Sequence, residues 1–494
     1  MPQTHCDGET IDLQKTAPSR NANREFLYMN TLALVLLALA PGFADSPIAL
    51  HPENSRYFIF QGKPTVLVGS TEHYGAVLNL DFDFIPYLDE LQARGFNLTR
   101  AFSGTYREVA GSFRIRDNTL APQRFIIPWT ATPDGKVDLD RFDLAYFKRA
   151  KEFLRAASRR GIVVEYVFFC PLYEDELWAI SPLNVKNNVN GVGDCKRDEV
   201  FTLKHPDLLK RQLAFVAKAV QELNEFDNLY FEICNEPYFG GVTLDWQARV
   251  ADTIVAAEKP LPKKHLIAQN IANNSQEIKS PDPRVSIFNF HYAVPEAARA
   301  NLALKKPIGD DETGFKGIAD HPYRSEAWLF LLSGGAIFDH LDYSFTASTE
   351  NGSAKVTPPT PGGGGPEIRK QFHFLKSFIE SFDFIHMSPD LSFVVDTDPT
   401  IARERTAGMV ESKKAYALYI DGGERFRHAE GRRIKIVLEL PRERYRLVWI
   451  DPKNGPVGKP REIEHMGGRL TLEAPPDLED VAVRIVVESK NAAK

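Results

Sequence analysis

The sequence carries no excess of positive charge. Lysine and arginine total 60 residues against 66 aspartates and glutamates, so the formal net charge is −6 at pH 7. A protein that binds nucleic acid generally presents a basic surface to the phosphates. We therefore expect no DNA or RNA partner.

Long apolar runs are also scarce, and no segment is long enough for a transmembrane helix. The most apolar run, residues 31–40, has the length of the apolar part of a secretory signal peptide, and small residues follow it. We predict that residues 1–44 are a leader and signal peptide cleaved after Ala44, so that the mature protein is secreted or periplasmic. A tail with a chance apolar patch, or a start at Met29, is the alternative.

Cysteine is rare, with four residues in the whole chain. Cys6 would leave with the leader, and Cys234 lies in an apolar segment, where a small buried hydrophobic residue is the simplest interpretation. Cys170 and Cys195 flank one long irregular segment. The sequence leaves open whether these two pair in an oxidising compartment.

Two motifs that would indicate other functions are missing. No glycine-rich dinucleotide fingerprint follows the first predicted strand, which counts against an open, doubly wound sheet. No His-x-His or His-x-x-x-His pair is present, which counts against a metal-dependent hydrolase. We therefore expect neither a cofactor nor a metal.

The chain does contain a regular alternation of strand and helix patterns. Eight strands, each followed by a helix or helix-like segment, are predicted at 65–69, 97–102, 162–169, 229–234, 265–270, 286–292, 307–312 and 336–345. Repeated β-α units imply a parallel sheet, and eight of them favour a closed barrel. We predict an α/β fold, a (β/α)8 TIM barrel over residues 45–388. The irregular segments 103–140 and 171–200 should wall its cleft.

The pattern changes after about residue 390. Short alternating segments such as 433–440 and 445–450 are separated by turns rich in glycine and asparagine. This pattern predicts a small antiparallel β-sandwich over residues 389–494. It contains no catalytic constellation, so we place the active site in the barrel.

Polar residues stand where the predicted barrel strands end. The carboxyl ends of the strands carry the working residues of such barrels, and here they are Arg100, Asn235, Glu236, His291, Tyr292 and Glu312. Pro237 ends the strand beside Glu236, because proline has no N–H for the sheet. A glutamate buried at a strand end is costly unless it is partnered or does chemistry.

Two such carboxyl groups are what glycoside hydrolysis requires. One carboxylic acid protonates the leaving oxygen, and in retaining enzymes the other attacks the anomeric carbon from about 5–5.5 Å away. We predict that Glu236 and Glu312 are this catalytic pair. Their side-chain oxygens must then converge at the mouth of one cavity.

The segment Phe231–Pro237, with the sequence Phe-Glu-Ile-Cys-Asn-Glu-Pro, resembles the fourth-strand signature of clan-A glycoside hydrolases of the cellulase and mannanase type, family five. The resemblance implies that Glu236 is the acid/base and that Asn235 contacts the sugar 2-hydroxyl. It implies that Glu312 is the seventh-strand nucleophile. The resemblance extends over roughly residues 55–385, the predicted barrel.

The same resemblance assigns the neighbouring strand ends. Tyr292 or His291 matches the sixth-strand group that hydrogen-bonds the nucleophile, and Arg100 matches the second-strand arginine. Tyr343 stands where the family usually has a tryptophan platform, and Cys170 stands where many members have a histidine. With its second domain, the chain resembles bacterial cellulase-like proteins that carry a collagen-binding-type C-terminal domain.

Several side chains have a structural alternative. Glu232 and Arg100 are interpreted first as a buried ion pair, with Arg100 also keeping Glu312 ionised. His291 is as well explained by a core role as by a ligand contact. Glu72 and His73 follow the first strand and are predicted to line a sugar subsite, and Tyr343 is predicted as a further substrate contact. Trp178, Tyr173 and Trp129 would stack on a sugar or else pack the long loops.

The resulting hypothesis is a monomeric, secreted, retaining glycoside hydrolase that cleaves β-linked oligo- or polysaccharides. The first alternative is a metal-dependent barrel hydrolase that would use Asp310, Asp311, Glu312 and His291. The second is a non-catalytic barrel that only binds carbohydrate.

Overall fold

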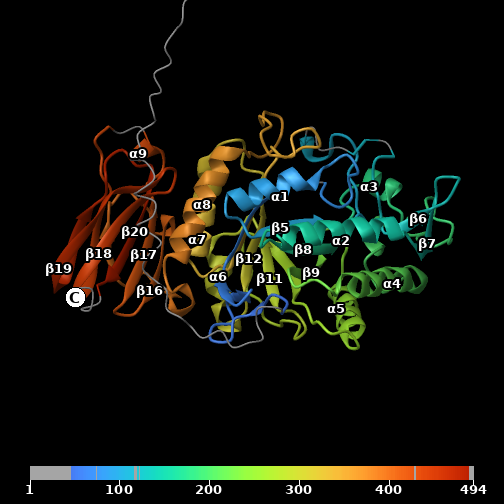
Figure 1. Ribbon diagram of the computed structural model, residues 1–494, viewed down its shortest axis with the longest axis horizontal. Helices are drawn as coiled ribbons and strands as arrows, with labels where there is room; N and C mark the ends of the chain where they lie inside the picture. Colours follow the sequence, from blue (N-terminus) through green and yellow to red (C-terminus); the bar gives the residue numbers. More distant parts are fainter. Residues whose placement is uncertain (1–45, 74, 116–119, 122, 428–429, 489–494) are drawn as a thin grey trace, which may run out of the picture. The chain divides into compact units, whose positions relative to one another are not determined.

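The computed structural model describes residues 46–73, 75–115, 120–121, 123–427 and 430–488. Its central feature is a closed barrel of parallel strands in the order β10-β11-β12-β13-β4-β5-β8-β9 (Figure 1). The barrel strands are β4 (Leu67–Thr71), β5 (Leu98–Phe102), β8 (Val163–Phe169), β9 (Leu229–Cys234), β10 (Ile267–Asn273), β11 (Ile287–His291), β12 (Ile308–Thr313) and β13 (Ile337–Leu341). The predicted (β/α)8 fold is confirmed, while the predicted leader and its signal peptide lie outside the described residues.

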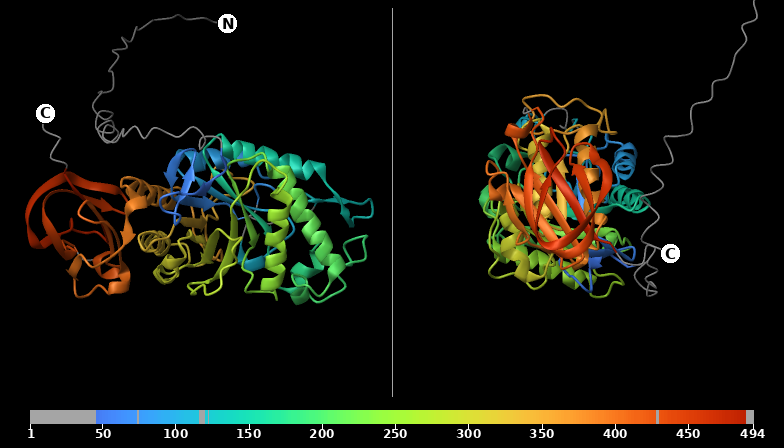
Figure 2. Two further views of the ribbon diagram at one scale, coloured as in Figure 1. Left: turned by 90° about the horizontal axis from the view of Figure 1, so that it is seen from below. Right: turned by 90° about the vertical axis from the view of Figure 1, so that its left-hand side faces the viewer.

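Helices surround this barrel, as two further views show (Figure 2). They are α1 (Phe84–Ala93), α2 (Leu144–Ser158), α3 (Asp175–Ile180), α4 (Pro206–Leu223), α5 (Leu244–Glu258), α6 (Pro295–Asn301), α7 (Asp320–Leu331) and α8 (Pro366–Glu380). Short 3-10 turns lie at Ser112–Arg114, Arg197–Glu199, Leu302–Leu304, Phe384–His386 and Arg403–Arg405. The segment between β10 and β11 is irregular, so the predicted helix-like segment does not form there.

The local sequence explains these elements. All seven residues of β8 are buried, as expected for a strand covered on both faces. The side chain of Asp143 accepts a hydrogen bond from the backbone N–H of Ala145 and so caps the start of α2. The apolar face of α2, which includes Phe147 and Phe153, is buried. Packing of this stripe fixes the helix on the barrel.

Two small sheets flank the barrel. One joins β1 (Ala49–Leu50), β2 (Phe58–Phe60) and β3 (Lys63–Thr65), and the other pairs β6 (Trp129–Ala131) with β7 (Val137–Phe142). Trp129 is buried against Phe215 of α4, with ring centroids 5.3 Å apart. Trp129 therefore packs the fold and does not stack on a sugar.

The C-terminal region forms one curled antiparallel sheet, so the predicted sandwich is not confirmed. Its strands are β14 (Ser388–Pro389), β15 (Val394–Thr397), β16 (Thr406–Glu411), β17 (Ala415–Asp421), β18 (Lys435–Asp451), β19 (Gly455–Glu473) and β20 (Asp480–Val487), with the short helix α9 (Glu424–Arg427). The two predicted strands 433–440 and 445–450 are one strand, β18. The chain does not turn between them, because Arg442, Glu443 and Arg444 continue to pair with β19.

No helix of the described ranges has both the length and the apolar composition needed to cross a bilayer. The cysteines at 170, 195 and 234 carry free thiols. The disulfide that the sequence left open between Cys170 and Cys195 is therefore not formed in this structure.

Candidate active site

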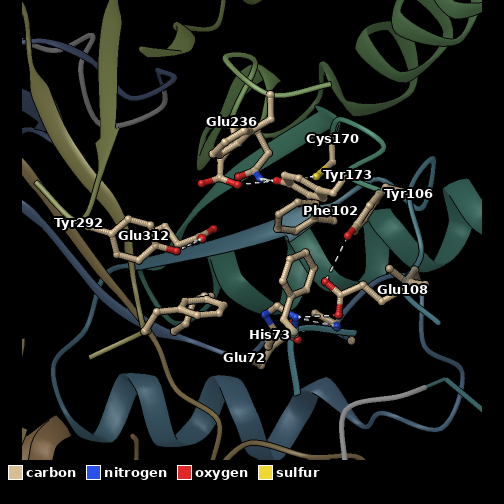
Figure 3. Close-up of a pocket in the computed structure, with 18 of the residues that line it drawn as sticks. Glu72, His73, Phe102, Tyr106, Glu108, Cys170, Tyr173, Glu236, Tyr292 and Glu312 are labelled. Carbon is tan, nitrogen blue, oxygen red and sulfur yellow. Dashed lines mark hydrogen bonds and ion pairs between the residues drawn. The ribbon is translucent and has the colours of Figure 1, made fainter. Parts of the chain in front are cut away.

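A cavity of about 390 Å³ opens at the carboxyl ends of the barrel strands (Figure 3). Among its lining residues are six that the sequence predicts for the site, Glu72, His73, Asn235, Glu236, Tyr292 and Glu312. They come from the ends of β4, β9, β11 and β12. Both long irregular segments also contribute, through Phe113 and Tyr173.

Glu236 follows the end of β9 and is held in a strained backbone conformation. Its φ of 37° lies in the left-handed region that non-glycine residues rarely adopt. Its carboxylate accepts hydrogen bonds from the Tyr173 hydroxyl at 2.5 Å and from the Tyr238 hydroxyl at 3.2 Å. The Nδ1 atom of His291 lies 3.2 Å from Oε1 of Glu236. Such strain persists only where surrounding contacts enforce it, and it clusters at functional sites.

Glu312 lies in β12 and faces Glu236 across the cavity. The hydroxyl of Tyr292 donates to Oε1 of Glu312 at 3.0 Å, and Nη1 of Arg100 donates to Oε2 at 3.0 Å. Tyr292 itself has a φ of 51°, again in the left-handed region. Both glutamates are thus held by hydrogen-bond donors from several barrel strands and the segments that follow them.

The two carboxylates are close enough to act on one bond. An oxygen of Glu236, an oxygen of Glu312 and a ring nitrogen of His291 all lie within 4.8 Å of one another. Inverting glycosidases need about 6.5–9.5 Å between the carboxyl groups to admit a water, whereas retaining enzymes need only about 5–5.5 Å. An approach of these two carboxylate oxygens to within 4.8 Å is compatible with direct attack by Glu312.

Arg100 anchors a network of carboxylates inside the barrel. Besides Glu312, its guanidinium contacts Glu232 at 3.2 Å, Glu165 at 3.3 Å and Asp311 at 3.5 Å. The side-chain amide of Asn289 donates to the same three carboxylates at 2.7–3.2 Å. Arg100 therefore contacts both Glu232 and Glu312.

The pKa values inside the barrel follow from burial and this network. Burial and the neighbouring Glu232 raise the pKa of Glu165 well above its usual range. Burial likewise raises the pKa of Asp311, despite the opposing effect of Arg100. Burial is also the largest effect on Glu232, but the charge of Arg100, the hydrogen bonds with Glu165 and Asp311 and the charge of His291 together outweigh it and lower the pKa of that carboxyl.

His291 and Glu236 are hydrogen-bonded to each other, and their pKa values indicate which of the two carries the proton. Burial lowers the pKa of His291, but the carboxylates of Glu312 and Asp311 outweigh it and raise that pKa to about 9. Burial raises the pKa of Glu236, yet the hydrogen bonds from His291, Tyr173 and Tyr238 together lower it. Near neutral pH the proton of this pair thus rests on the imidazole of His291.

Four predicted residues lie away from the cavity surface. His291 and Arg100 are buried behind it and act on its glutamates. The Trp178 indole donates to the backbone carbonyl of Cys195 at 3.2 Å and packs the loop. Tyr343 is buried, with its ring 5.7 Å from that of His73. The sequence predicted Trp178 and Tyr343 as sugar contacts, but neither side chain lines the cavity.

Among the described residues, two clusters have the donor chemistry of a metal site. The first is Glu236 with His291 and Glu312, and the second is Glu165 with Glu232 and Asp311. The guanidinium of Arg100 already contacts all three carboxylates of the second cluster. The four ligands considered from the sequence do not form one cluster among the described residues: Asp310 belongs to neither group, and its carboxylate accepts the backbone N–H of Ala293.

Sequence reasoning missed several residues in or beside the cavity. Tyr238 holds Glu236 and follows Pro237 directly, so its position in the chain was the only available signal. Tyr173 was considered only for stacking or loop packing. Glu108, which lies 3.2 Å from His73, gave no signal in the sequence at all.

Comparison with known proteins finds solved structures that have the same fold. No family model matches the chain, and no curated protein matches it. A glycoside hydrolase family 5 structure from Bacteroides vulgatus ATCC 8482 aligns with a TM-score of 0.62 at 13% identity, covering 91% of this chain and 95% of that one. A structure described as a glycoside hydrolase aligns with a TM-score of 0.60 at 14% identity, covering 91% and 98%.

The chain shares its fold with these glycoside hydrolases. A second protein from the same Bacteroides strain gives a TM-score of 0.62 at 15% identity and covers 91% of this chain and 84% of that one. This coverage extends past the barrel into the C-terminal sheet. At such low identity the likeness establishes the architecture, and the chemistry has to be argued from the site.

Proposed function

We propose that the protein is a retaining glycoside hydrolase of β-linked carbohydrate, with Glu236 as acid/base and Glu312 as nucleophile. The observation that carries the proposal is the convergence of these two carboxylates within 4.8 Å at a cavity. Both stand at the carboxyl ends of barrel strands, where such barrels place their chemistry. The parallel sheet is a closed barrel rather than the open doubly wound sheet of the alternative, and Asp310 lies in neither candidate metal cluster of the described residues.

In the first step Glu236 delivers a proton to the glycosidic oxygen while Glu312 attacks the anomeric carbon. The proton is available 3.2 Å away on Nδ1 of His291. Bound substrate displaces water from the carboxylate of Glu236 and so favours its neutral form. His291 then passes its proton to Glu236, so that Glu236 is protonated when it acts as the acid.

The nucleophile is prepared by its own partners. Arg100 and Tyr292 donate to different oxygens of Glu312, which fixes the carboxylate in position. In the second step Glu236 removes a proton from water, which attacks the glycosyl ester and releases the sugar with its original anomeric configuration. Tyr173 and Tyr238 keep Glu236 in place through both steps.

We extend the proposal to the protein as a whole. Residues 1–44 would direct it out of the cytoplasm, residues 45–388 would catalyse, and residues 389–494 would be an accessory domain. We propose that it acts as a monomer without a cofactor. Its substrate would be a carbohydrate, because the cavity carries no excess of cationic side chains for an anionic polymer such as nucleic acid.

Covalent trapping tests this proposal. The protein is incubated with 2-deoxy-2-fluoro β-glycosides of glucose, galactose, mannose and xylose, and the labelled peptide is mapped by mass spectrometry. We expect one glycone to label Glu312, because the fluorine slows hydrolysis of the ester. If Glu312→Gln and the wild-type protein are equally inert and unlabelled across the panel, the non-catalytic alternative is supported instead.

A further inference from the structure

The cavity has one polar wall that suits sugar hydroxyl groups. The carboxylate of Glu108 accepts the Tyr106 hydroxyl at 3.3 Å and lies 3.2 Å from Nε2 of His73. Glu72, next to His73, accepts the backbone N–H of Ala76 at 2.9 Å. Figure 3 shows these side chains on the opposite side of the cavity from Glu236. Sugar recognition needs such a small number of fixed polar groups.

The mouth of the cavity is different, because phenylalanines line it. Phe113, Phe239 and Phe315 all line the cavity and remain 36%, 43% and 40% exposed. We call these three residues the phenylalanine rim. The ring of Tyr173 lies 5.5 Å from Phe113 and 5.9 Å from Phe239, and Phe113 lies 6.3 Å from Phe315. Exposed aromatic residues gathered at one place mark a binding surface.

Phe113 is held in this position at a cost. Its φ is 51°, and the next residue, Arg114, has a φ of 62°. A non-glycine residue in this region costs of the order of 1–3 kcal/mol, and such strain is found at ligand clamps. The side chain gains little burial in return, since it stays partly exposed. The conformation is explained if a ligand covers the ring.

The polar groups near the rim are already used. The hydroxyl of Tyr173 donates to Glu236, and the hydroxyl of Tyr238 also donates to Asn273 at 2.5 Å. The ammonium of Lys316, which follows Phe315, lies 2.7 Å from Glu326. A sugar ring on the rim would therefore find apolar rings packed edge to face, with few partners for its hydroxyl groups.

Given the proposed function, on which this inference rests, we propose that the phenylalanine rim is an apolar leaving-group subsite. The leaving group departs beside the acid. Glu236 is held by Tyr173, whose ring packs against Phe113 and Phe239. The preferred substrate is then a β-glycoside with an apolar aglycone, alkyl or aryl, rather than a sugar joined to a further sugar.

Binding of uncleaved analogues tests the subsite without relying on hydrolysis. Isothermal titration calorimetry of the wild-type protein would compare hexyl, phenyl and methyl 1-thio-β-glycosides, and the matching thio-linked disaccharides, for glucose, galactose, mannose and xylose. For the glycone that binds, we expect the hexyl or phenyl compound to bind at least about tenfold more tightly than both the methyl compound and the disaccharide. The stronger of the two identifies the aglycone as alkyl or aryl.

Variants connect the preference to the rim. Phe113→Ala and Phe239→Ala should each remove most of the tenfold advantage, whereas Phe113→Leu should retain it for the hexyl compound. Leu244→Ala is the matched control, because Leu244 is 73% exposed and does not line the cavity. A disaccharide that binds as tightly as the apolar glycosides, or a preference that survives both alanine variants, would overturn the inference.

The outcome is separable from that of the proposed function. Trapping on Glu312 together with tight disaccharide binding would overturn the apolar subsite and leave the hydrolase standing. Tight binding of the hexyl or phenyl compound without any trapping or turnover would support the subsite and contradict the hydrolase.

Discussion

The barrel and the C-terminal sheet have interiors of opposite chemistry. Inside the barrel, Arg100 contacts four carboxylates. His291 contacts the carboxylate of Glu236 and two of the four that Arg100 contacts. The sheet instead covers a cluster of buried apolar side chains that includes Ile436, Leu438 and Tyr445. Replacing buried charge by apolar packing is often neutral or stabilising. The comparison teaches that the barrel interior is arranged for the site, and the sheet interior for stability.

The largest difference should appear in catalysis. Glu312→Gln removes the nucleophile, and we expect kcat to fall about 10⁴-fold or more, because the remaining groups cannot form the glycosyl ester. The control is Glu439→Gln, which makes the same chemical change at an exposed position of β18. Initial rates on an aryl β-glycoside measure both. Equal rates for wild-type and Glu312→Gln would show that this carboxylate does no chemistry.

Stability should respond next, through the charge network. Arg100→Met leaves Glu232 and its neighbours without their cation, and breaking a buried ion pair in this way costs about 3–5 kcal/mol. Urea unfolding followed by circular dichroism gives the change in the free energy of unfolding. Arg444→Met, at an exposed arginine of β18 that contacts Glu462, should cost about 1 kcal/mol or less. Similar losses for both variants would contradict the contrast between the two interiors.

A core variant of the sheet should affect stability alone. Leu438→Ala removes a fully buried side chain and should lower the free energy of unfolding by about 2–5 kcal/mol. Because Leu438 lies in the apolar cluster of the sheet, kcat per folded molecule should stay unchanged. The measurement is kcat corrected for the folded fraction. A tenfold loss of corrected kcat would show that the sheet contributes to the site.

The smallest effect is on the pH profile. The pKa of His291 is raised to about 9, so its proton is present below that pH and is lost above it. We therefore expect kcat/KM to fall as pH rises through about 9. Asp311→Asn removes the carboxylate 3.5 Å from Nε2 of His291 and should move this limb down by roughly one pH unit. Asp396→Asn, at an exposed aspartate of β15, is the control, and an unmoved limb in Asp311→Asn would exclude His291 as its origin.

Much of the barrel was predictable because its strands are continuous apolar runs. Strand β8 is buried along its whole length, and its residues fit neither the alternation of a half-buried strand nor the period of an amphipathic helix. The C-terminal sheet was not predictable in the same way. Strand β18 passes through Pro441 and three exposed polar residues without turning, and β19 is mostly exposed, so local patterning suggested two short strands. Pairing along the whole length of β18 with the next strand, β19, decided the outcome.

The site shows the same division. Glu236 and Glu312 were found because each stands at a strand end, where the barrel itself fixes the side chain. Trp178 was predicted in the cavity from its residue type and Tyr343 from the family resemblance, but both side chains are buried in the packing of the fold. The phenylalanine rim was missed because loop conformation, and the strain at Phe113, leave no periodic signal in the sequence.

Chemical rescue by azide tests the central claim most directly, since it assigns each glutamate to its face of the bond. With a 2,4-dinitrophenyl β-glycoside of the glycone found by trapping, Glu312→Ala plus azide should give the α-glycosyl azide, because azide replaces the missing nucleophile. Glu236→Ala plus azide should give the β-glycosyl azide, because azide attacks the ester on Glu312. Proton NMR distinguishes the two anomers. The same anomer from both variants, or the reverse assignment, would contradict the roles given to Glu236 and Glu312.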